Sequence, residues 1–417
     1  MSNPQRALGA PTRGRARLTL SSVALATAFA ASAFSSAAAT AAPVSSVDLS
    51  NYVRVGRYDL PEPTRTTAPA GNLLAQEASG VTYNPDTGTL FIVGDGGTSV
   101  TQVTKTGQFV DAMTLPAGGS SQNTEFYDTE GITYIGNGEF VMTEERDRQL
   151  VRFTYAPGTT LTRAQTKTVK LGTTVGNVGL EGLTDDPSTG DFIPVKETSP
   201  LGIFQTSVDF DAGTASNGSP TTVNSTDLFT PALAGVADFA DIFALSNLPA
   251  VTGAEGDNLV IISQESGKVV EVTRAGAVQS SLTINADLDT TISVADQTHE
   301  GVTMDDEGNL YVVSENGGGS INFPQLWVYA PATQPNEAPT AVALVNRVAS
   351  VLENTPTTSR FKVADVRVGD DGLGTYQLGV TGPDAASFEV DASGLYLKAG
   401  VTLDFETKTS YNVAVTA

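Results

Sequence analysis

The chain has 417 residues, a formal net charge of −23, no cysteine and a single histidine. An acidic surface repels nucleic acid and anionic lipid and favours cations or basic partners, although acidity also simply keeps a protein soluble. The residue counts exclude disulfides, cysteine nucleophiles, thiolate metal sites and any zinc or iron site built from several histidines of this chain.

Residues 1–41 have the three parts of a secretory signal peptide. A basic segment is followed by the small apolar stretch LTLSSVALATAFAASAF, and then by Ala39-Thr40-Ala41, which matches an A-x-A cleavage site. The apolar stretch is shorter than the ~20 residues that a membrane span needs. We therefore predict a bacterial protein that is exported to the cell surface or beyond, with no transmembrane span.

A repeated phrase dominates residues 42–331. One copy is EGITYIGNGEFVMTEE, residues 130–145, in which an acid and a glycine open an apolar run and a turn leads to a second run that ends in acid. Related copies occupy residues 77–95, 181–197 and 300–315. The repeat is about 50 to 60 residues long and reads as short strands joined by turns, which is typical of a β-propeller.

We expect six blades, with five as the alternative. The pattern blurs over Val208–Pro249, where a degenerate sixth blade is expected. The early strand YVRVGRYDLP, residues 52–61, is expected to close the ring by completing a blade with strands from the end of the repeat region. Helical periodicity is almost absent, so the predicted fold class is all-β.

A second domain follows the repeats. Residues 332–340 are rich in Pro, Ala and Thr and read as a linker. Residues 341–417 alternate like the strands of a single Ig-like or cadherin-like β-sandwich and stop in strand-like sequence, so we expect a truncated domain and a longer natural protein.

The motifs of residues 60–329, in their order, resemble the SdiA-regulated family of exported β-propellers. The resemblance implies the fold and no established reaction. Propellers related at the level of fold include calcium-dependent lactonases and phytase-like esterases.

The tail resembles a bacterial cadherin-like repeat, through Glu353-Asn354, Asp365 and the run Leu403-Asp404-Phe405-Glu406. This resemblance implies a calcium site formed by Glu353, Asp365, Asp404 and Glu406. The sequence departs from the pattern at Arg367, which takes the place of a second acid, and at Asn336-Glu337, which replace a longer acidic linker motif.

The leading acid of each repeat is expected at the start of the innermost strand, where it would face the central channel. These acids are Glu77, Glu130, Glu181 and Glu300, with Asp238 as the counterpart in the blurred segment. A second recurring set, at the end of the next strand, is Asp95, Glu145, Glu197, Glu265 and Glu315.

Two roles are open for the leading acids. Several carboxylates around a narrow channel raise one another's pKa unless a cation neutralises them, and Ca²⁺ suits such a site because it accepts about 6–8 oxygen ligands. Alternatively, each carboxylate braces the structure by accepting hydrogen bonds from backbone amides of the neighbouring blade, which needs no metal.

Four further residues lie beside these acids. His299 precedes Glu300 and is predicted at the channel mouth, where carboxylates would raise its pKa toward about 7 and make it a candidate general base; the alternative is a solvent-facing histidine. Arg146, Arg148 and Lys196 adjoin the second acid set and are expected to form surface salt bridges or to clamp an anionic ligand.

Two functions remain open. The first is an exported calcium-binding module for adhesion, or for binding an extracellular protein, glycan or small molecule, and the cadherin-like tail favours it. The second is a calcium-dependent hydrolase, such as a lactonase or phosphoesterase, with its site in the channel. The sequence contains no nucleophile elbow, P-loop or catalytic-triad motif, which favours binding over catalysis.

Overall fold

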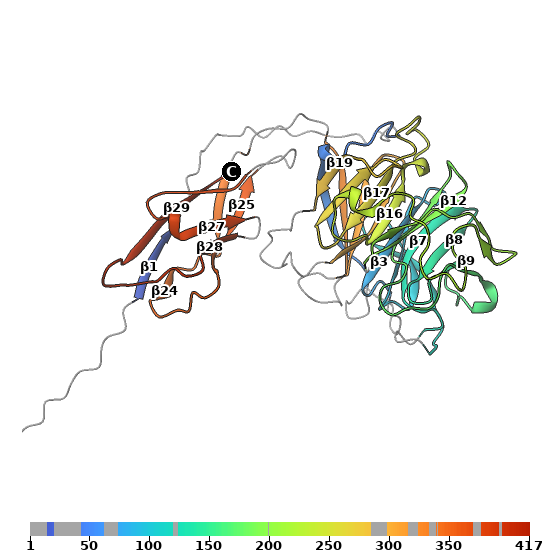
Figure 1. Cartoon of the computed structure of the whole chain (residues 1–417), viewed down its shortest axis with the longest axis horizontal. Helices are drawn as coiled ribbons and strands as arrows, with labels where there is room; N and C mark the ends of the chain where they lie inside the picture. Colours follow the sequence, from blue (N-terminus) through green and yellow to red (C-terminus); the bar gives the residue numbers. More distant parts are fainter. Residues whose placement is uncertain are drawn as a thin grey trace, which may run out of the picture. The chain divides into compact units, whose positions relative to one another are not determined.

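The structure is a computed structural model of the chain. It describes residues 15–20 (backbone only), 43–61, 74–119, 124–198, 200–284, 298–315, 324–332, 339, 341–369, 377–391 and 394–417. The chain divides into two compact units, drawn in Figure 1 and described separately here: Phe34–Asn336 with Gly372–Gly374, and Met1–Ala33 with Glu337–Asp371 and Thr375–Ala417. Across the described residues, we find no helix with the length and apolar character needed to cross a membrane.

The larger unit is built from antiparallel sheets that follow one another along the chain. The first sheet contains β3 (Ala78–Asn84), β4 (Thr89–Gly94), β5 (Ser99–Val103) and β6 (Phe109–Thr114). The second contains β7 (Thr129–Gly136), β8 (Glu139–Glu144), β9 (Gln149–Thr154) and β10 (Lys167–Lys170). The third contains β11 (Leu183–Asp186), β12 (Asp191–Lys196) and β13 (Gly202–Ile203).

Two more sheets complete this unit. The fourth contains β16 (Asp241–Ala244), β17 (Leu259–Ser263), β18 (Lys268–Val272) and β19 (Val278–Thr283). The fifth contains β20 (His299–Met304), β21 (Leu310–Ser314), β22 (Gln325–Pro331) and the early strand β2 (Tyr52–Asp59). The chain therefore closes on itself through β2, which pairs antiparallel with β22 as the sequence predicts.

The first strands of the five sheets form a closed cycle. Strand β3 contacts β7, β7 contacts β11, β11 contacts β16, β16 contacts β20, and β20 contacts β3. This is the arrangement of a β-propeller, in which the innermost strands surround a central channel.

The segment Val208–Pro249 does not form a separate sheet of the cycle. Its described residues hold the small hairpin of β14 (Val208–Asp209) and β15 (Thr214–Ala215), a 3-10 turn η3 (Pro231–Ala234), strand β16, and a second 3-10 turn η4 (Leu245–Asn247). The described residues thus place five sheets around the cycle, and the expected sixth is not among them.

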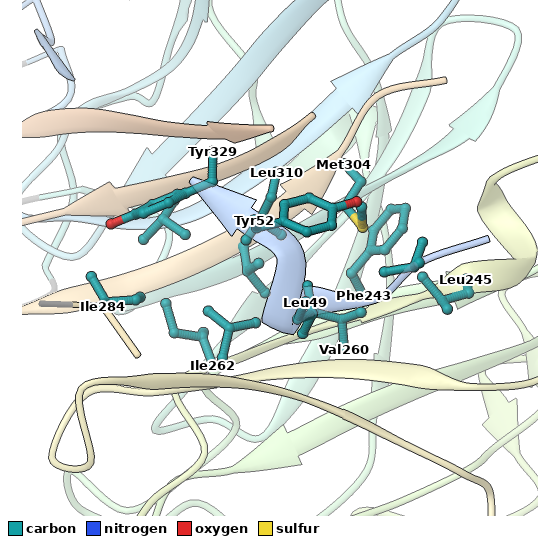
Figure 2. Close-up of a cluster of buried hydrophobic side chains, with 14 of the residues drawn as sticks. Leu49, Tyr52, Phe243, Leu245, Val260, Ile262, Ile284, Met304, Leu310 and Tyr329 are labelled. Carbon is teal, nitrogen blue, oxygen red and sulfur yellow. The ribbon is translucent and has the colours of Figure 1, made fainter. Parts of the chain in front are cut away.

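Apolar side chains fill the spaces between neighbouring sheets. Strands β17 and β21 are buried along their whole length, as expected for strands covered on both faces. Figure 2 shows the cluster at the point of closure, where Leu49 and Tyr52 from the start of the unit lie among Phe243, Ile262 and Tyr329 from the fourth and fifth sheets. The Tyr52 hydroxyl also donates a hydrogen bond to the Gly308 carbonyl at 2.9 Å. Apolar packing and a buried hydrogen bond therefore both stabilise the closure of the ring.

The smaller unit contains two sheets that share one hydrophobic cluster. One has the order β24 (Ser350–Leu352), β1 (Arg15–Leu20), β29 (Ser410–Thr416) and β26 (Gly379–Thr381). The other has the order β23 (Ala341–Val345), β25 (Phe361–Gly369), β28 (Gly394–Leu397) and β27 (Phe388–Asp391). Apart from β1, the predicted signal peptide lies outside the described residues, as do most of the predicted linker residues.

Candidate cation site in the propeller channel

The glycine of the repeated acid-glycine pair is required by the close approach of neighbouring inner strands. A Cβ atom added to Gly131 would lie 2.7 Å from the carbonyl oxygen of Glu181, and one added to Gly301 would lie 2.7 Å from the carbonyl oxygen of Ser79. A side chain at either position would push the two neighbouring inner strands apart. The repeat therefore keeps glycine for packing.

The threonine two residues after that glycine joins each sheet to the next. Its side-chain oxygen accepts a hydrogen bond from a backbone amide of the neighbouring inner strand, at distances of 3.0 to 3.2 Å. The donor and acceptor pairs are Tyr83 with Thr303, Tyr134 with Thr82, Asp185 with Thr133, and Ala244 with Thr184.

Asp241 joins the remaining strands of the cycle. Its Oδ1 accepts from the Leu183 amide at 3.1 Å and its Oδ2 accepts from the Val302 amide at 2.9 Å, so one carboxylate links β11, β16 and β20. The bracing role that the sequence suggested for the leading glutamates thus belongs to threonine and to Asp241. In the described residues, no backbone amide donates to the carboxylates of Glu130, Glu181 or Glu300.

Two of the leading glutamates, Glu130 and Glu300, lie at β-bulges. The pairing of β7 with β8 shifts register around Glu130, and the pairing of β20 with β21 shifts around Glu300. A bulge adds an unpaired residue and redirects its side chain. The equivalent bulge of the first sheet falls at Ser79 rather than at Glu77, so the sequence alignment of Glu77 with the other two is two residues out of register.

The backbone just before three inner strands is left-handed. The residues are Glu77 with φ 48°, Asp128 with φ 56° and Thr298 with φ 39°. Non-glycine residues adopt this conformation rarely, and such strained positions concentrate where a site needs its groups held in place.

Glu130, Glu181 and Glu300 come from three different sheets, and electrostatic repulsion couples them. Burial raises the pKa of each well above its ordinary range, and the negative charges of neighbouring acids raise it further. For Glu181 those neighbours include both Glu130 and Glu300. Mutual repulsion of this kind acts between carboxylates that lie near one another.

The second acid set meets the first at the same end of the channel. Carboxylate oxygens of Asp95, Asp128 and Glu130 lie within 4.8 Å of one another. Burial and the charges of Glu77 and Asp128 raise the pKa of Asp95 to about 7. Burial likewise raises the pKa of Glu145 to about 7, against a hydrogen bond from the Gly179 amide that lowers it.

The other members of the second set are less uniform. The pKa values of Glu197 and Glu315 are raised, chiefly by burial and then by neighbouring acids. Glu265 is exposed, and its amide donates to Asp238 Oδ1 at 3.0 Å. Asp238 is thereby held in a turn by backbone donors, unlike the leading glutamates.

Few ion pairs are made with this cluster. Among the described residues, only Arg146 forms an ion pair with it, through contacts of Nε with Asp128 and, at 3.6 Å, with Glu145 Oε2. This confirms the expected salt bridges for Arg146. Arg148 and Lys196, which were expected to form surface salt bridges, are buried instead, with no ion pair in the described part of the chain.

The prediction for His299 is wrong in both of its forms. Its side chain is 6% exposed, and its ring packs against Trp327 with centroids 4.9 Å apart. Burial lowers its pKa to about 4, so the ring is neutral at physiological pH. The ring therefore lies in the packed interior beside Trp327 of β22.

Three of the predicted calcium ligands in the tail, Asp365, Asp404 and Glu353, form separate local contacts. Asp365 pairs with Lys362 Nζ at 2.6 Å and accepts from Asn346 Nδ2 at 2.7 Å. Asp404 caps a turn by accepting from Thr407, while Glu353 accepts from the Phe405 amide at 3.3 Å. Glu353 and the run that contains Glu406 therefore adjoin, but calcium binding by the tail stays a prediction.

Comparison with known proteins supplies the family. The sequence profile described as SdiA-regulated matches residues 65–317, more than half of the chain. The chain belongs to the SdiA-regulated family. Human protocadherin Fat 4 is 34% identical over 109 residues, which are 25% of this chain and 2% of that protein, so the chain spans a very small part of this relative.

Several solved structures resemble this SdiA-regulated protein at low identity. Myxococcus xanthus glutaminyl cyclase is 10% identical, with a TM-score of 0.39 over 67% of this chain and 95% of that one. A luciferin-regenerating enzyme is 11% identical, with a TM-score of 0.38 over 62% and 92%. Virginiamycin B lyase from Staphylococcus aureus is 12% identical, with a TM-score of 0.32 over 69% and 92%.

Sequence reasoning missed three parts of the site in this SdiA-regulated protein. Asp128 precedes the leading acid by two residues, and its counterpart in the first sheet is Glu77, which the sequence alignment had matched with Glu130 instead. The bracing threonines were within reach, because Thr follows Glu-Gly at a fixed spacing in residues 130–133, 181–184 and 300–303. The burial of Arg148 and Lys196 had no signal in the local sequence.

Proposed function

We propose that this protein is an exported calcium-binding protein, in which a five-bladed β-propeller holds Ca²⁺ at the acidic end of its channel and uses that end as a ligand-binding face. The observation that carries the proposal is the approach of Asp95, Asp128 and Glu130 to within 4.8 Å of one another. Glu181 and Glu300 face the same space from other sheets.

The donor set fits calcium. All of the converging groups are carboxylates, and hard oxygen ligands with flexible geometry favour Ca²⁺ over zinc, copper or iron. Buried carboxylates that repel one another are costly, and a divalent ion removes that cost for several groups together. The backbone braces leave Glu130, Glu181 and Glu300 available for this role.

The hydrolase alternative shares the metal but loses His299 as its base, which leaves an acid of the second set for that role. A buried neutral His299 that packs on Trp327 has no access to a substrate in the channel. A binding function therefore accounts for the geometry with fewer parts, and adhesion through the cadherin-like tail is the role that we propose for the two units together.

Calcium binding to the full chain tests the proposal. We would strip the protein with chelator, titrate Ca²⁺ by isothermal calorimetry, and compare wild type with a Glu130→Gln plus Glu300→Gln variant. We expect at least one Ca²⁺ per chain, bound about tenfold or more weakly by the double variant because two anionic ligands are lost.

Two controls separate the channel from the rest of the chain. A Glu139→Gln plus Glu307→Gln variant removes the same charge from the second and fifth sheets, at residues that pair with Arg152 and Lys105, and should bind calcium as wild type does. A Glu353→Gln plus Asp404→Asn variant tests the tail. Calcium that survives the channel substitutions and disappears with the tail substitutions would refute a channel site.

A further inference from the structure

We propose that Arg148 and Lys196 form an anion subsite beside the acidic cluster, so that the ligand of this face carries a phosphate or carboxylate group. This inference deepens the proposed function and rests on it for the metal half of the site. The anion would be held by the two cations on one side and by the channel calcium on the other.

Arg148 is a buried arginine that forms no ion pair within the described part of the chain. Its side chain is 2% exposed, and its guanidinium group packs against Gly172. Nη1 donates to the Val223 carbonyl at 2.6 Å, while the buried Nε has no hydrogen-bond partner. A guanidinium group that is taken out of water normally receives a carboxylate or phosphate in return.

Lys196 has the same character. It is 7% exposed, and among the described residues its ammonium group donates to the backbone carbonyl oxygens of Thr198 and Pro200. The pKa of Lys196 is lowered by burial and then by the positive charge of Arg148, whereas the negative charges of Glu181, Glu145 and Glu197 raise it. Repulsion between two buried cations is unfavourable, and an anion that contacts both would relieve it.

The backbone places both cations at the edge of the acidic cluster. The Arg148 amide donates to the Glu145 carbonyl at 2.9 Å, closing the turn that carries Glu145. Lys196 follows Val195, whose carbonyl accepts from the Glu181 amide at 3.0 Å. One cation therefore belongs to the second sheet and the other to the third, and each is held next to an acid that faces the channel.

The cations nevertheless form no ion pair with those acids in the described residues. The Arg148 Nε, which has no hydrogen-bond partner among the described residues, is a donor that an anionic ligand would use. An oxyanion fits this arrangement, because its oxygens accept from guanidinium and ammonium groups and also coordinate Ca²⁺. The exposed segment around Val223, whose side chain is 69% exposed, covers Arg148 and is the part of the chain that an entering anion would displace.

Direct binding of inorganic phosphate tests the inference. We would titrate phosphate into the full chain in chelator and again with calcium below the concentration that precipitates calcium phosphate, with acetate as the carboxylate probe. Wild type should bind at least one of the two anions, more tightly with calcium. Arg148→Met and Lys196→Met should each weaken that binding tenfold or more.

Matched variants control for surface charge and for folding. Arg152 lies on β9, the strand that follows Arg148, and Lys170 lies on β10; each forms an ion pair of its own. The variants Arg152→Met and Lys170→Met should leave anion binding unchanged. Arg148→Lys keeps the charge and should retain part of the affinity, which a merely misfolded variant would not. Circular dichroism checks the fold of each.

The outcomes separate this inference from the calcium site. Wild type that binds neither phosphate nor acetate, with or without calcium, overturns the anion subsite even where calcium binds normally. Equal anion binding by wild type, Arg148→Met and Lys196→Met also overturns it. Anion binding that depends on both cations in chelator, in a protein that binds no calcium, supports the subsite and refutes the proposed function.

Discussion

The acidic cluster predicts an unusual dependence of stability on pH when calcium is absent. We would remove calcium with chelator and measure urea unfolding at pH 5 and at pH 8. The chain has one tryptophan, Trp327, which is fully buried in the larger unit. Its fluorescence therefore reports unfolding of the propeller without interference from the smaller unit.

The magnitude follows from Glu145, whose side chain is 1% exposed. Burial raises its pKa from 4.5 to about 7 in the folded protein. Between these values the folded state binds more protons than the unfolded state, so stability falls as pH rises and the loss is complete above pH ~7. At about 1.4 kcal/mol for each pKa unit, Glu145 alone lowers the free energy of unfolding by on the order of 3 kcal/mol at pH 8.

Calcium and substitution should both remove this effect. Bound Ca²⁺ stabilises the ionised carboxylates, so it should raise the urea midpoint more at pH 8 than at pH 5. Glu145→Gln keeps an oxygen for the Gly179 amide but cannot ionise, so its calcium-free stability should depend less on pH, whereas Glu139→Gln should behave as wild type. A calcium-free wild type that is equally stable, or more stable, at pH 8 would refute the electrostatic reasoning.

Three further predictions concern the scaffold. Thr184→Val removes the acceptor of the buried Ala244 amide and should cost about 1–3 kcal/mol of unfolding free energy, which Thr184→Ser largely restores. Gly131→Ala forces a Cβ atom to 2.7 Å from the Glu181 carbonyl and should lower the urea midpoint, whereas Gly176→Ala, with nothing within 4 Å, should not. The single histidine should give NMR imidazole signals that do not titrate between pH 5.5 and 8, because its pKa is lowered to about 4; a midpoint near ~6.5 would contradict its burial.

The strand content and the repeat could be predicted from the sequence because they depend on local signals. Turn residues such as those around Gly138 and Gly190, where φ is +74°, recur between apolar runs and mark where each strand ends. The chain closure through β2 was also within reach, because a lone early strand in a repeat protein needs a partner. The blurred segment before Pro249 was harder, because the third sheet is short and its hairpin β14–β15 imitates a separate unit.

The roles within the repeated phrase could not be assigned from the sequence, because they depend on contacts between units. Glu, Gly and Thr recur together, and recurrence alone does not say which residue joins the sheets. The structure separates them: glycine permits the approach of backbones, threonine accepts the neighbouring amide, and glutamate at a bulge is left facing the channel.

That division explains why the acids can gather at all. If each glutamate had to brace its neighbour, its charge would be satisfied by amides and the channel would need no ion. Since Thr133, Thr184 and Asp241 hold the strands together, the carboxylates of Glu130, Glu181 and Glu300 contribute repulsion rather than stability to the calcium-free fold. A cluster that weakens the fold persists only where something else uses it, and a divalent cation is the ligand whose charge and oxygen preference match it.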